Sequence, residues 1–341
     1  MEEWTAQVTF MNVGNGDAIL IEAPDPERRD GLFVMVIDGG SGEQAEYADR
    51  STGRLRAVDY MEKRGIKYID VMVCTHIHED HTCGLLPIAL KWCPEFLWQP
   101  FPAELSEIMK LLNDGTGEES GRKLIAALNG YAALCRYVKA QGGRVIQAKP
   151  GYPDSSTMFP ANGIRIHILG PAEEALDRQT ARLKALYQEG RRDLLPALDR
   201  CMNSSSMILH IACGEKTFLL AGDAEASDYE ACRGDIKADV FKVGHHGQAN
   251  SLTPEILHAV SPQYAVICAS SDRRYESAAP PVLEQLYKSG IPVYYSDCPT
   301  VAPFADKIEP HTAAVFRVMR AGRLYAAYNQ ERCITDGTGK S

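Results

Sequence analysis

The stretch Thr75-His76-Ile77-His78-Glu79-Asp80-His81 follows the apolar run Tyr68 to Cys74, which is typical of a strand. Side chains in an extended segment repeat with a period of two, so His76 and His78 point to the same side and can bind one ion together. The chain must turn after Glu79, which lets Asp80 and His81 face a second ion beside the first. Paired ions of this kind lie roughly 3.5 to 4 Å apart and act on one substrate oxygen. The stretch therefore predicts a two-metal site at the end of a strand.

The alternative interpretation is a surface loop that happens to be rich in histidine and acidic residues. The spacing H-x-H-x-D-H directly after a strand-like run argues against it.

Two more acidic residues fit a supporting role. Asp38 precedes Gly39 and Gly40, which let the backbone approach closely, and we expect it to orient a ligand imidazole. Asp17 is predicted to act in the same way.

Several other segments accompany this motif. They are Asn12-Val13-Gly14-Asn15-Gly16-Asp17, Ile37-Asp38-Gly39-Gly40, Ala221-Gly222-Asp223 and Val243-Gly244-His245-His246-Gly247. Together with the histidine motif they resemble the metallo-β-lactamase fold superfamily, and within it the ComEC-type branch of DNA-uptake proteins. The resemblance runs from about Val8 to about Tyr295, which is most of the chain. ComEC proteins carry this hydrolase domain attached to a membrane channel, whereas here we expect a stand-alone soluble protein.

The resemblance implies a mixed α/β (α+β) fold, a four-layer αββα sandwich with helical insertions. It also implies that Asp223 bridges both ions; the alternative role for Asp223 is an N-cap for a helix over Ala224 to Gly234. By analogy with the family, we assign His245 to the second ion. His246 would then face the substrate as a catalytic proton donor or hydrogen-bond donor, and the reverse division of this adjacent pair stays open.

Two features depart from the wider pattern. Many superfamily members offer a further histidine to the first ion. This chain has Asn203 at that point, and the ComEC branch resembles it in placing an asparagine there. Its amide oxygen, directly or through water, would give an oxygen-richer site that accepts manganese as well as zinc. ComEC-type domains usually also carry a late histidine before a proline, but this chain has Tyr275-Glu276-Ser277-Ala278-Ala279-Pro280. Either His246, or one of Tyr275 and Glu276, takes over the catalytic or substrate-contacting role of that late histidine, or the enzyme is slow on the family's usual substrate.

Composition narrows the class of protein. The net charge of −9 over 341 residues argues against a protein that coats nucleic acid by electrostatics alone, although it does not exclude a nuclease with bound metal ions. The ten cysteines form no C-x-x-C pair, which is typical of reduced cysteines in a cytosolic protein. The start of the chain lacks a signal-peptide pattern, and no apolar run approaches the roughly 20 residues needed to cross a bilayer. We therefore expect a cytoplasmic protein without a membrane partner.

Hydrophobic periodicity predicts one domain over residues 1–341, with a helical insertion within residues 101–200 near the rim of the site. The predicted strands are Gln7 to Met11, Ala18 to Ile21, Leu32 to Asp38, Tyr68 to Cys74, Arg144 to Ile146, Ile164 to Leu169, Ser206 to Cys213, Lys216 to Leu220, Val240 to Val243, Tyr264 to Ala269, Val293 to Tyr295, Ala313 to Met319 and Leu324 to Tyr328. The predicted helices are Arg54 to Lys63, Gly84 to Lys91, Ala103 to Leu112, Glu119 to Gln141, Glu173 to Arg200, Pro254 to Val260 and Val282 to Ser289.

The predicted reaction is hydrolysis, because a water that bridges two divalent cations ionises near neutral pH and the same ions polarise the electrophile. We expect two zinc ions, with manganese as an alternative, and Asp80 to orient the hydroxide. The leading hypothesis is a phosphodiesterase or nuclease acting on a small-molecule or nucleic-acid phosphodiester. The alternatives are a carboxylic ester, lactone or amide hydrolase, and a domain that keeps the metals without hydrolysis. Basic residues of the insertion, among them Lys123, Arg136, Lys139, Arg144 and Arg191, would favour a polyanion if several lined one groove; otherwise they are solvated helix faces. The sequence leaves the oligomeric state open.

Overall fold

The strands of this protein form two sheets, which a computed structural model describes over residues 4–113, 118–153, 159, 163–232, 234–305 and 308–329. Within these ranges the first sheet has eight strands in the order β14-β13-β1-β2-β3-β4-β5-β6. Their bounds are β1 (Trp4–Met11), β2 (Ile19–Pro24), β3 (Leu32–Ile37), β4 (Val71–Val73), β5 (Phe96–Gln99), β6 (Arg144–Gln147), β13 (Ala313–Met319) and β14 (Leu324–Asn329). The strands from β14 to β3 pair antiparallel, and those from β3 to β6 pair parallel.

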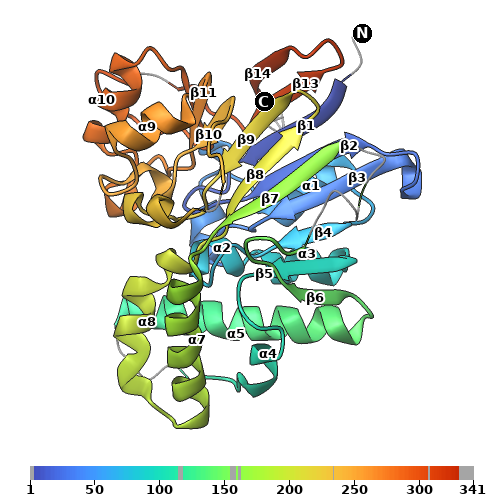
Figure 1. Ribbon diagram of the computed structural model, residues 1–341, viewed down its shortest axis with the longest axis vertical. Helices are drawn as coiled ribbons and strands as arrows, with labels where there is room; N and C mark the ends of the chain where they lie inside the picture. Colours follow the sequence, from blue (N-terminus) through green and yellow to red (C-terminus); the bar gives the residue numbers. More distant parts are fainter. Residues whose placement is uncertain are drawn as a thin grey trace, which may run out of the picture.

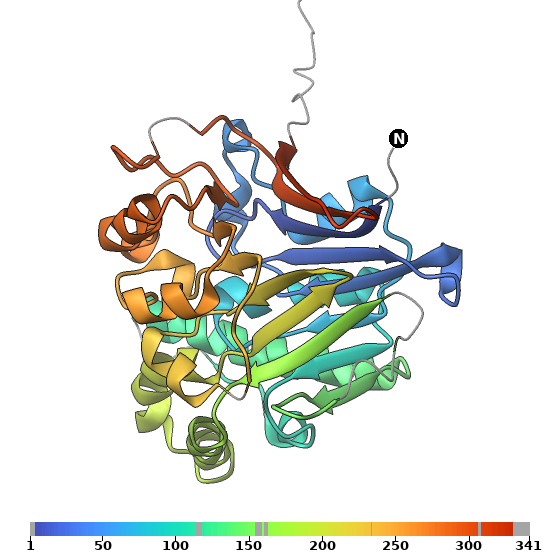
Figure 2. The same cartoon turned by 45° about the horizontal axis from the view of Figure 1, so that its top comes forward.

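The second sheet has six strands in the described residues, in the order β12-β11-β10-β9-β8-β7. Their bounds are β7 (Ile164–Gly170), β8 (Ile208–Cys213), β9 (Lys216–Leu220), β10 (Val240–Lys242), β11 (Tyr264–Ile267) and β12 (Val293–Tyr295). The pairs β9–β10, β10–β11 and β11–β12 are parallel, whereas β7, β8 and β9 form an antiparallel meander. Figures 1 and 2 show the two sheets stacked face to face.

Helices cover the outer face of each sheet. They are α1 (Ala57–Arg64), α2 (Glu79–Thr82), α3 (Leu85–Lys91), α4 (Leu105–Ile108), α5 (Glu119–Ala140), α7 (Glu173–Gln188), α8 (Leu195–Cys201), α9 (Pro254–Val260) and α10 (Pro280–Lys288). The alternation of side chains along β2 shows how the layers separate: Ile19 and Ile21 pack between the sheets, whereas Leu20 packs under the helices of the first sheet. A third apolar core joins α9 and α10 to the second sheet. These three cores separate four layers, so the predicted αββα sandwich is confirmed.

The sequence-based element prediction was wrong at three places. Strand β5 was missed, although it is buried in the middle of the parallel part of the first sheet. The helix predicted over Ala103 to Leu112 is only the single turn of α4. The segment Glu173 to Arg200 contains two helices, α7 and α8, because Gly190 adopts a left-handed φ of 72° between them.

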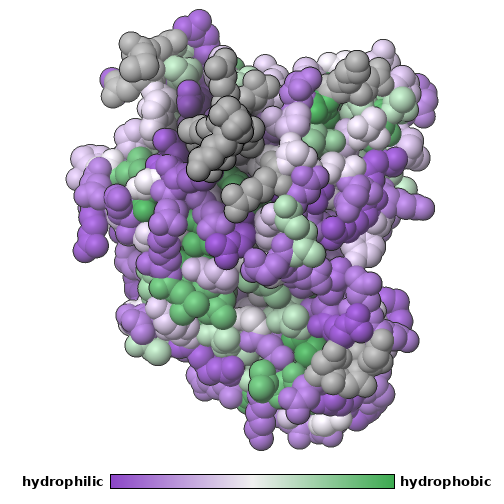
Figure 3. All heavy atoms as spheres, turned by 180° about the vertical axis from the view of Figure 1, so that it is seen from behind, coloured by the Kyte–Doolittle hydropathy of each residue, from purple (hydrophilic) through white to green (hydrophobic). Residues whose placement is uncertain are grey.

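The helices of residues 101–200 lie together at one end of the molecule (Figure 1), where α5 packs against α4 and α8, and α7 against α4 and α8. The same segment also supplies β6 and β7, the edge strands of the two sheets. From behind, the surface is mainly hydrophilic, with separate apolar patches toward this helical end (Figure 3). In the part of the chain that the structure describes, no helix has the length and apolar character needed to cross a bilayer.

Candidate metal centre

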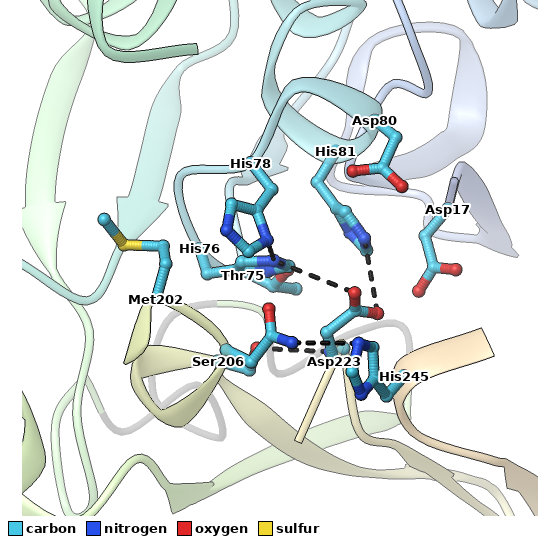
Figure 4. Close-up of polar contacts among 12 residues, drawn as sticks. Asp17, Thr75, His76, His78, Asp80, His81, Met202, Ser206, Asp223 and His245 are labelled. Carbon is cyan, nitrogen blue, oxygen red and sulfur yellow. Dashed lines mark hydrogen bonds and ion pairs between the residues drawn. The ribbon is translucent and has the colours of Figure 1, made fainter. Parts of the chain in front are cut away.

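The candidate site lies where the carboxyl ends of parallel strands from both sheets meet. Strand β3 delivers Asp38, and its parallel neighbour β4 delivers the loop from Thr75 into α2. In the second sheet, β9 leads to Asp223 and its parallel neighbour β10 leads to the His245-His246 turn. Because parallel strands end at the same edge, loops far apart in sequence converge there, and Figure 4 shows their side chains directed toward one another.

The first group of metal-ligand side chains is His76, His78 and Asp223, whose ligand atoms all lie within 4.8 Å of one another. Nε2 of His76 lies 3.1 Å from Nδ1 of His78 and 4.0 Å from Oδ2 of Asp223. His76 is fully buried, and burial together with the neighbouring imidazoles holds its pKa well below its usual value. A neutral imidazole is the form that binds a metal ion.

The second group contains Asp17, His81, Asp223 and His246. Nε2 of His81 lies 3.3 Å from Oδ1 of Asp223, and Nε2 of His246 lies 3.1 Å from Oδ2 of the same residue. The two imidazoles approach to 3.4 Å between their Nε2 atoms. Burial would lower the pKa of both histidines, but the carboxylates around them outweigh it, Asp223 most of all, and raise it well above the usual value.

Asp223 belongs to both groups, and its two oxygens face different histidines (Figure 4). Burial acts to raise its pKa, but the imidazoles of His246 and His81 outweigh this and hold it well below the usual value. Its alternative role as a helix N-cap does not apply, because the following 3-10 helix, Ala226–Ala231, is capped by Glu225. The position between the groups is the one a bridging carboxylate needs.

Asp80 lies at the open side of the second group. Its Oδ2 is 3.4 Å from Nε2 of His246 and accepts a hydrogen bond of 2.8 Å from Nδ2 of Asn15. Burial raises the pKa of Asp80, whereas the hydrogen bond with His246 and the charge of His81 outweigh it and lower the pKa. Gly16 has a φ of 105°, and a Cβ at this position would lie 1.9 Å from the backbone oxygen of Asp80, so only glycine fits here.

The geometry favours the reverse of the predicted division between His245 and His246. Both residues have a left-handed φ, 46° and 51°, so the turn directs the two rings differently. His246 is the ring within the second group, and its Nδ1 donates to the backbone oxygen of Cys268 at 2.8 Å. His245 instead accepts from Nδ2 of Asn203 at 3.0 Å and donates from Nδ1 to Asn250 at 3.1 Å. We therefore transfer the predicted ligand role to His246 and the substrate-facing role to His245.

The donor set fits divalent metal ions. Among the described residues, the buried atoms Oδ1 of Asp223, Oδ1 of Asn203 and Oδ1 of Asp17 have no hydrogen-bond partner. Such oxygens are costly unless something satisfies them, and a cation does so. The mixture of imidazole nitrogens with carboxylate and amide oxygens suits zinc and also accepts manganese.

Three residues that contact the predicted ligands were missed in the sequence. The backbone oxygen of Asp199 lies 3.3 Å from Nε2 of His78, and Asn15 holds Asp80 as described above. Lys242, fully buried at the end of β10, forms an ion pair with Asp17 and donates to the backbone oxygen of Gly222 at 2.7 Å. A lysine inside an apolar strand is a signal for a buried ion pair, whereas no local pattern marks Asp199.

A cavity of about 280 Å³ opens over the site, bordered by Asp80, Asp223, His245 and His246. Asn203 and Tyr275 also border it, and so does Lys123 from the helical segment. His167 and His210 form a cross-strand pair on β7 and β8 and do not border this cavity.

The two stacked sheets with helices on their outer faces, and the cluster of histidines and aspartates at their shared edge, are the arrangement that the resemblance seen in the sequence predicted. More particularly, the chain is similar to ComEC-type competence proteins. It is 26% identical over 302 residues to ComE operon protein 3 of Bacillus subtilis (strain 168), covering 85% of this chain and 32% of that protein. It is 34% identical over 95 residues to Recombination protein 2 of Haemophilus influenzae, covering 27% of this chain and 12% of that protein.

The chain thus spans about a third or less of these curated relatives. No family model matches it. Among solved structures, it is similar to the metallohydrolase Igni18 of Ignicoccus hospitalis, with a TM-score of 0.43, 13% identity and coverage of 91% of this chain and 98% of that chain.

Proposed function

We propose that this protein is a two-metal hydrolase of phosphodiesters. The observation that carries the proposal is the position of Asp223, whose Oδ1 faces His81 at 3.3 Å and whose Oδ2 lies 4.0 Å from His76 and 3.1 Å from His246. One carboxylate between two groups of imidazoles is the arrangement that holds two ions side by side. Two adjacent cations match the charge that spreads over phosphoryl oxygens in the transition state.

In this proposal, His76, His78 and Asn203 would hold the first ion, Asp80, His81 and His246 would hold the second, and Asp223 would be shared by both. When bound, the ions supply Lewis acidity toward the phosphoryl oxygen and lower the pKa of water. Asp80 accepts a hydrogen bond from the attacking water and fixes its direction. His245, at the cavity wall, would face the leaving group and offer it a proton or hydrogen bond from Nε2, once that nitrogen has gained a proton in place of its contact with Asn203. The ions proposed are zinc, with manganese as the alternative.

The test is hydrolysis of bis(p-nitrophenyl) phosphate by protein loaded with Zn²⁺ or Mn²⁺, with bound metal measured by mass spectrometry. Asp80→Ala is compared with Asp49→Ala, a control at an exposed aspartate away from the cavity. We expect activity that Asp80→Ala abolishes and Asp49→Ala retains, with about two ions per chain. Absence of hydrolysis with either metal would reject the phosphodiesterase and direct the search to carboxylic esters and lactones. The predicted cytoplasmic location stays a prediction.

A further inference from the structure

Two side chains from distant parts of the sequence meet at the cavity wall. Lys123 comes from α5, and Tyr275 comes from the loop between β11 and α10; both border the cavity. Nζ of Lys123 donates to the hydroxyl of Tyr275 at 3.2 Å and lies 5.8 Å from the centroid of its ring. The helical segment therefore reaches the site through a cation placed against an aromatic ring.

The loop that carries Tyr275 is anchored to the body of the protein by the residue before it. Its backbone has a left-handed φ of 54°, and the preceding Arg274 forms an ion pair of 2.6 Å with the buried Glu46. Tyr275 as a whole is 59% exposed. An exposed ring on an anchored loop is available to a ligand, because neither neighbouring side chains nor a mobile backbone has to be displaced.

The ammonium of Lys123 has partners that an anion can replace. Glu119, one helical turn earlier, lies 3.1 Å away but is itself largely exposed, and Glu43 lies 3.9 Å away. Exposed ion pairs of this kind contribute little, whereas a phosphate offers several oxygens to one ammonium. Only 18% of the Lys123 side chain is exposed, and its ammonium lies among Tyr275, Glu119 and Glu43 at the cavity wall.

Among the described residues, Lys123 is the one lysine or arginine that borders the cavity, whereas Glu79, Asp80, Asp199 and Asp223 also border it. Other basic residues of the segment have partners elsewhere. Arg136 and Lys139 donate to backbone oxygens around α4, and Arg191 pairs with Asp193. An extended nucleic acid needs a row of cations along its backbone, and the described residues that line the cavity offer only one lysine or arginine. A cavity of about 280 Å³ also lies at the small end of the usual range for ligand pockets.

We propose that the cavity selects small phosphodiesters that carry a second anionic group, and that Lys123, held by Tyr275, binds this second group. The inference rests on the proposed function, since the metal ions would hold the scissile phosphodiester. Lys123 and Tyr275 are then residues that determine specificity rather than reactivity. Removing the charge of Lys123 should therefore remove most of the preference for the second anion.

The test uses two matched pairs of ligands. Binding to the metal-loaded protein is measured by calorimetry for thymidine 3′,5′-bisphosphate and for thymidine 5′-monophosphate. Hydrolysis is measured for the dinucleotide TpT with and without a 5′-phosphate. One hydrogen-bonded ion pair predicts a preference of about tenfold or more for the ligand with two anionic groups, in Kd and in KM rather than in kcat. Lys123→Met should reduce that preference to about twofold, and Lys123→Arg should restore most of it.

Lys184→Met, at an exposed lysine of α7 away from the cavity, is the matched control and should keep the full preference. Tyr275→Phe removes only the hydroxyl and should weaken the preference in part. Hydrolysis of bis(p-nitrophenyl) phosphate by Lys184→Met should stay within about twofold of wild type, because the substitution lies away from the cavity and the metal ligands.

An unchanged preference in Lys123→Met would overturn the inference, and so would a single-stranded 20-nucleotide DNA that is cleaved with a higher kcat/KM than phosphorylated TpT. Failure of the proposed function has a different signature, the absence of hydrolysis of every phosphodiester by the wild-type protein. If that occurred while the calorimetric preference depended on Lys123, the specificity assignment would stand and the hydrolytic proposal would fall.

Discussion

Oδ2 of Asp38 lies 2.8 Å from Nδ1 of His81, and the same carboxylate also supports a histidine of the other proposed metal position. It accepts hydrogen bonds from the backbone N–H of Thr75 at 2.8 Å and from its hydroxyl at 2.6 Å. Since that hydroxyl donates to Asp38, it is free to accept from Nδ1 of His76, 3.1 Å away. One buried carboxylate thus fixes the tautomer of two proposed ligands, with Nε2 of each ring directed toward the site.

Asp38→Asn should weaken metal binding by roughly 10- to 100-fold, because the loss of such a supporting group typically has that effect. Asparagine tolerates the left-handed φ of 57° at this position, so the backbone should persist. Affinity is measured by competition with a chromophoric chelator, with Asp25→Asn as a buried control far from the site. Wild-type affinity in Asp38→Asn would mean that the histidines are oriented without it.

The roles of the adjacent histidines are separable by substitution. His246→Ala should lower the bound metal from about two ions to about one per chain, because it removes a ring that lies within the second group. His245→Ala should retain both ions and slow turnover, by roughly 10²- to 10⁴-fold if it serves as the proton donor. Metal content by mass spectrometry and kcat on bis(p-nitrophenyl) phosphate give the two readouts. Loss of metal from His245→Ala alone would restore the original assignment.

The fold followed from the sequence where side-chain periodicity is unambiguous. Strand β9 and helix α9 have the bounds that the sequence predicted, and α1 ends at Gly65 with a left-handed φ of 83°. Strand β5 was not predicted, because its four residues are all buried and lie between Pro94 and Pro100. A short strand that is covered on both faces and apolar at three of its four positions has no alternation to reveal it.

The part of the site that comes from one loop was predictable from the sequence, whereas the parts that depend on backbone conformation or on long-range packing were not. The ligands of the Thr75–His81 stretch come from one loop, so their spacing alone indicated the chemistry. The division between His245 and His246 depends on two successive left-handed residues, which residue types do not specify. Asp199 approaches His78 because α8 packs against α5, which also packs against α2; this relation spans 121 positions of sequence, and no local pattern contains it.

Removing one member of the buried ion pair Lys242–Asp17 should destabilise the protein more than removing both. Lys242 is fully buried. Burial acts to raise the pKa of Asp17, but the charge of Lys242 outweighs this and holds that pKa below its usual value. Lys242→Met leaves this carboxylate buried without its cation and should reduce the free energy of unfolding by about 3 to 5 kcal/mol. The double variant Lys242→Met/Asp17→Asn should recover a large part of that loss.

Urea unfolding of the four proteins, with chelator present to remove metal, completes this double-mutant cycle. A double variant as unstable as Lys242→Met alone would show that the lysine acts through Gly222, whose backbone oxygen it also contacts at 2.7 Å, rather than through Asp17.

Asp70, at the opposite end of β4 from the metal centre, should make stability depend on pH. Burial raises the pKa of Asp70 to about 6, although the backbone N–H of Val34 at 2.7 Å and Arg28 at 3.4 Å both favour its ionised form. The folded pKa lies above the unfolded value of about 3.9, so the folded state binds more protons between these values. The contribution of Asp70 to stability is therefore fully present below about pH 4 and is lost as the pH rises through about 6.

Asp70→Asn keeps an oxygen that can accept from Val34 but carries no charge at any pH. We expect the variant to be more stable than wild type at pH 7.5, and the difference to shrink steadily and vanish near pH 4. Urea unfolding of both proteins at four pH values measures this difference directly, because pH effects on all other groups cancel between them. A difference that stays constant with pH would show that Asp70 ionises in the folded protein as it does in the unfolded chain.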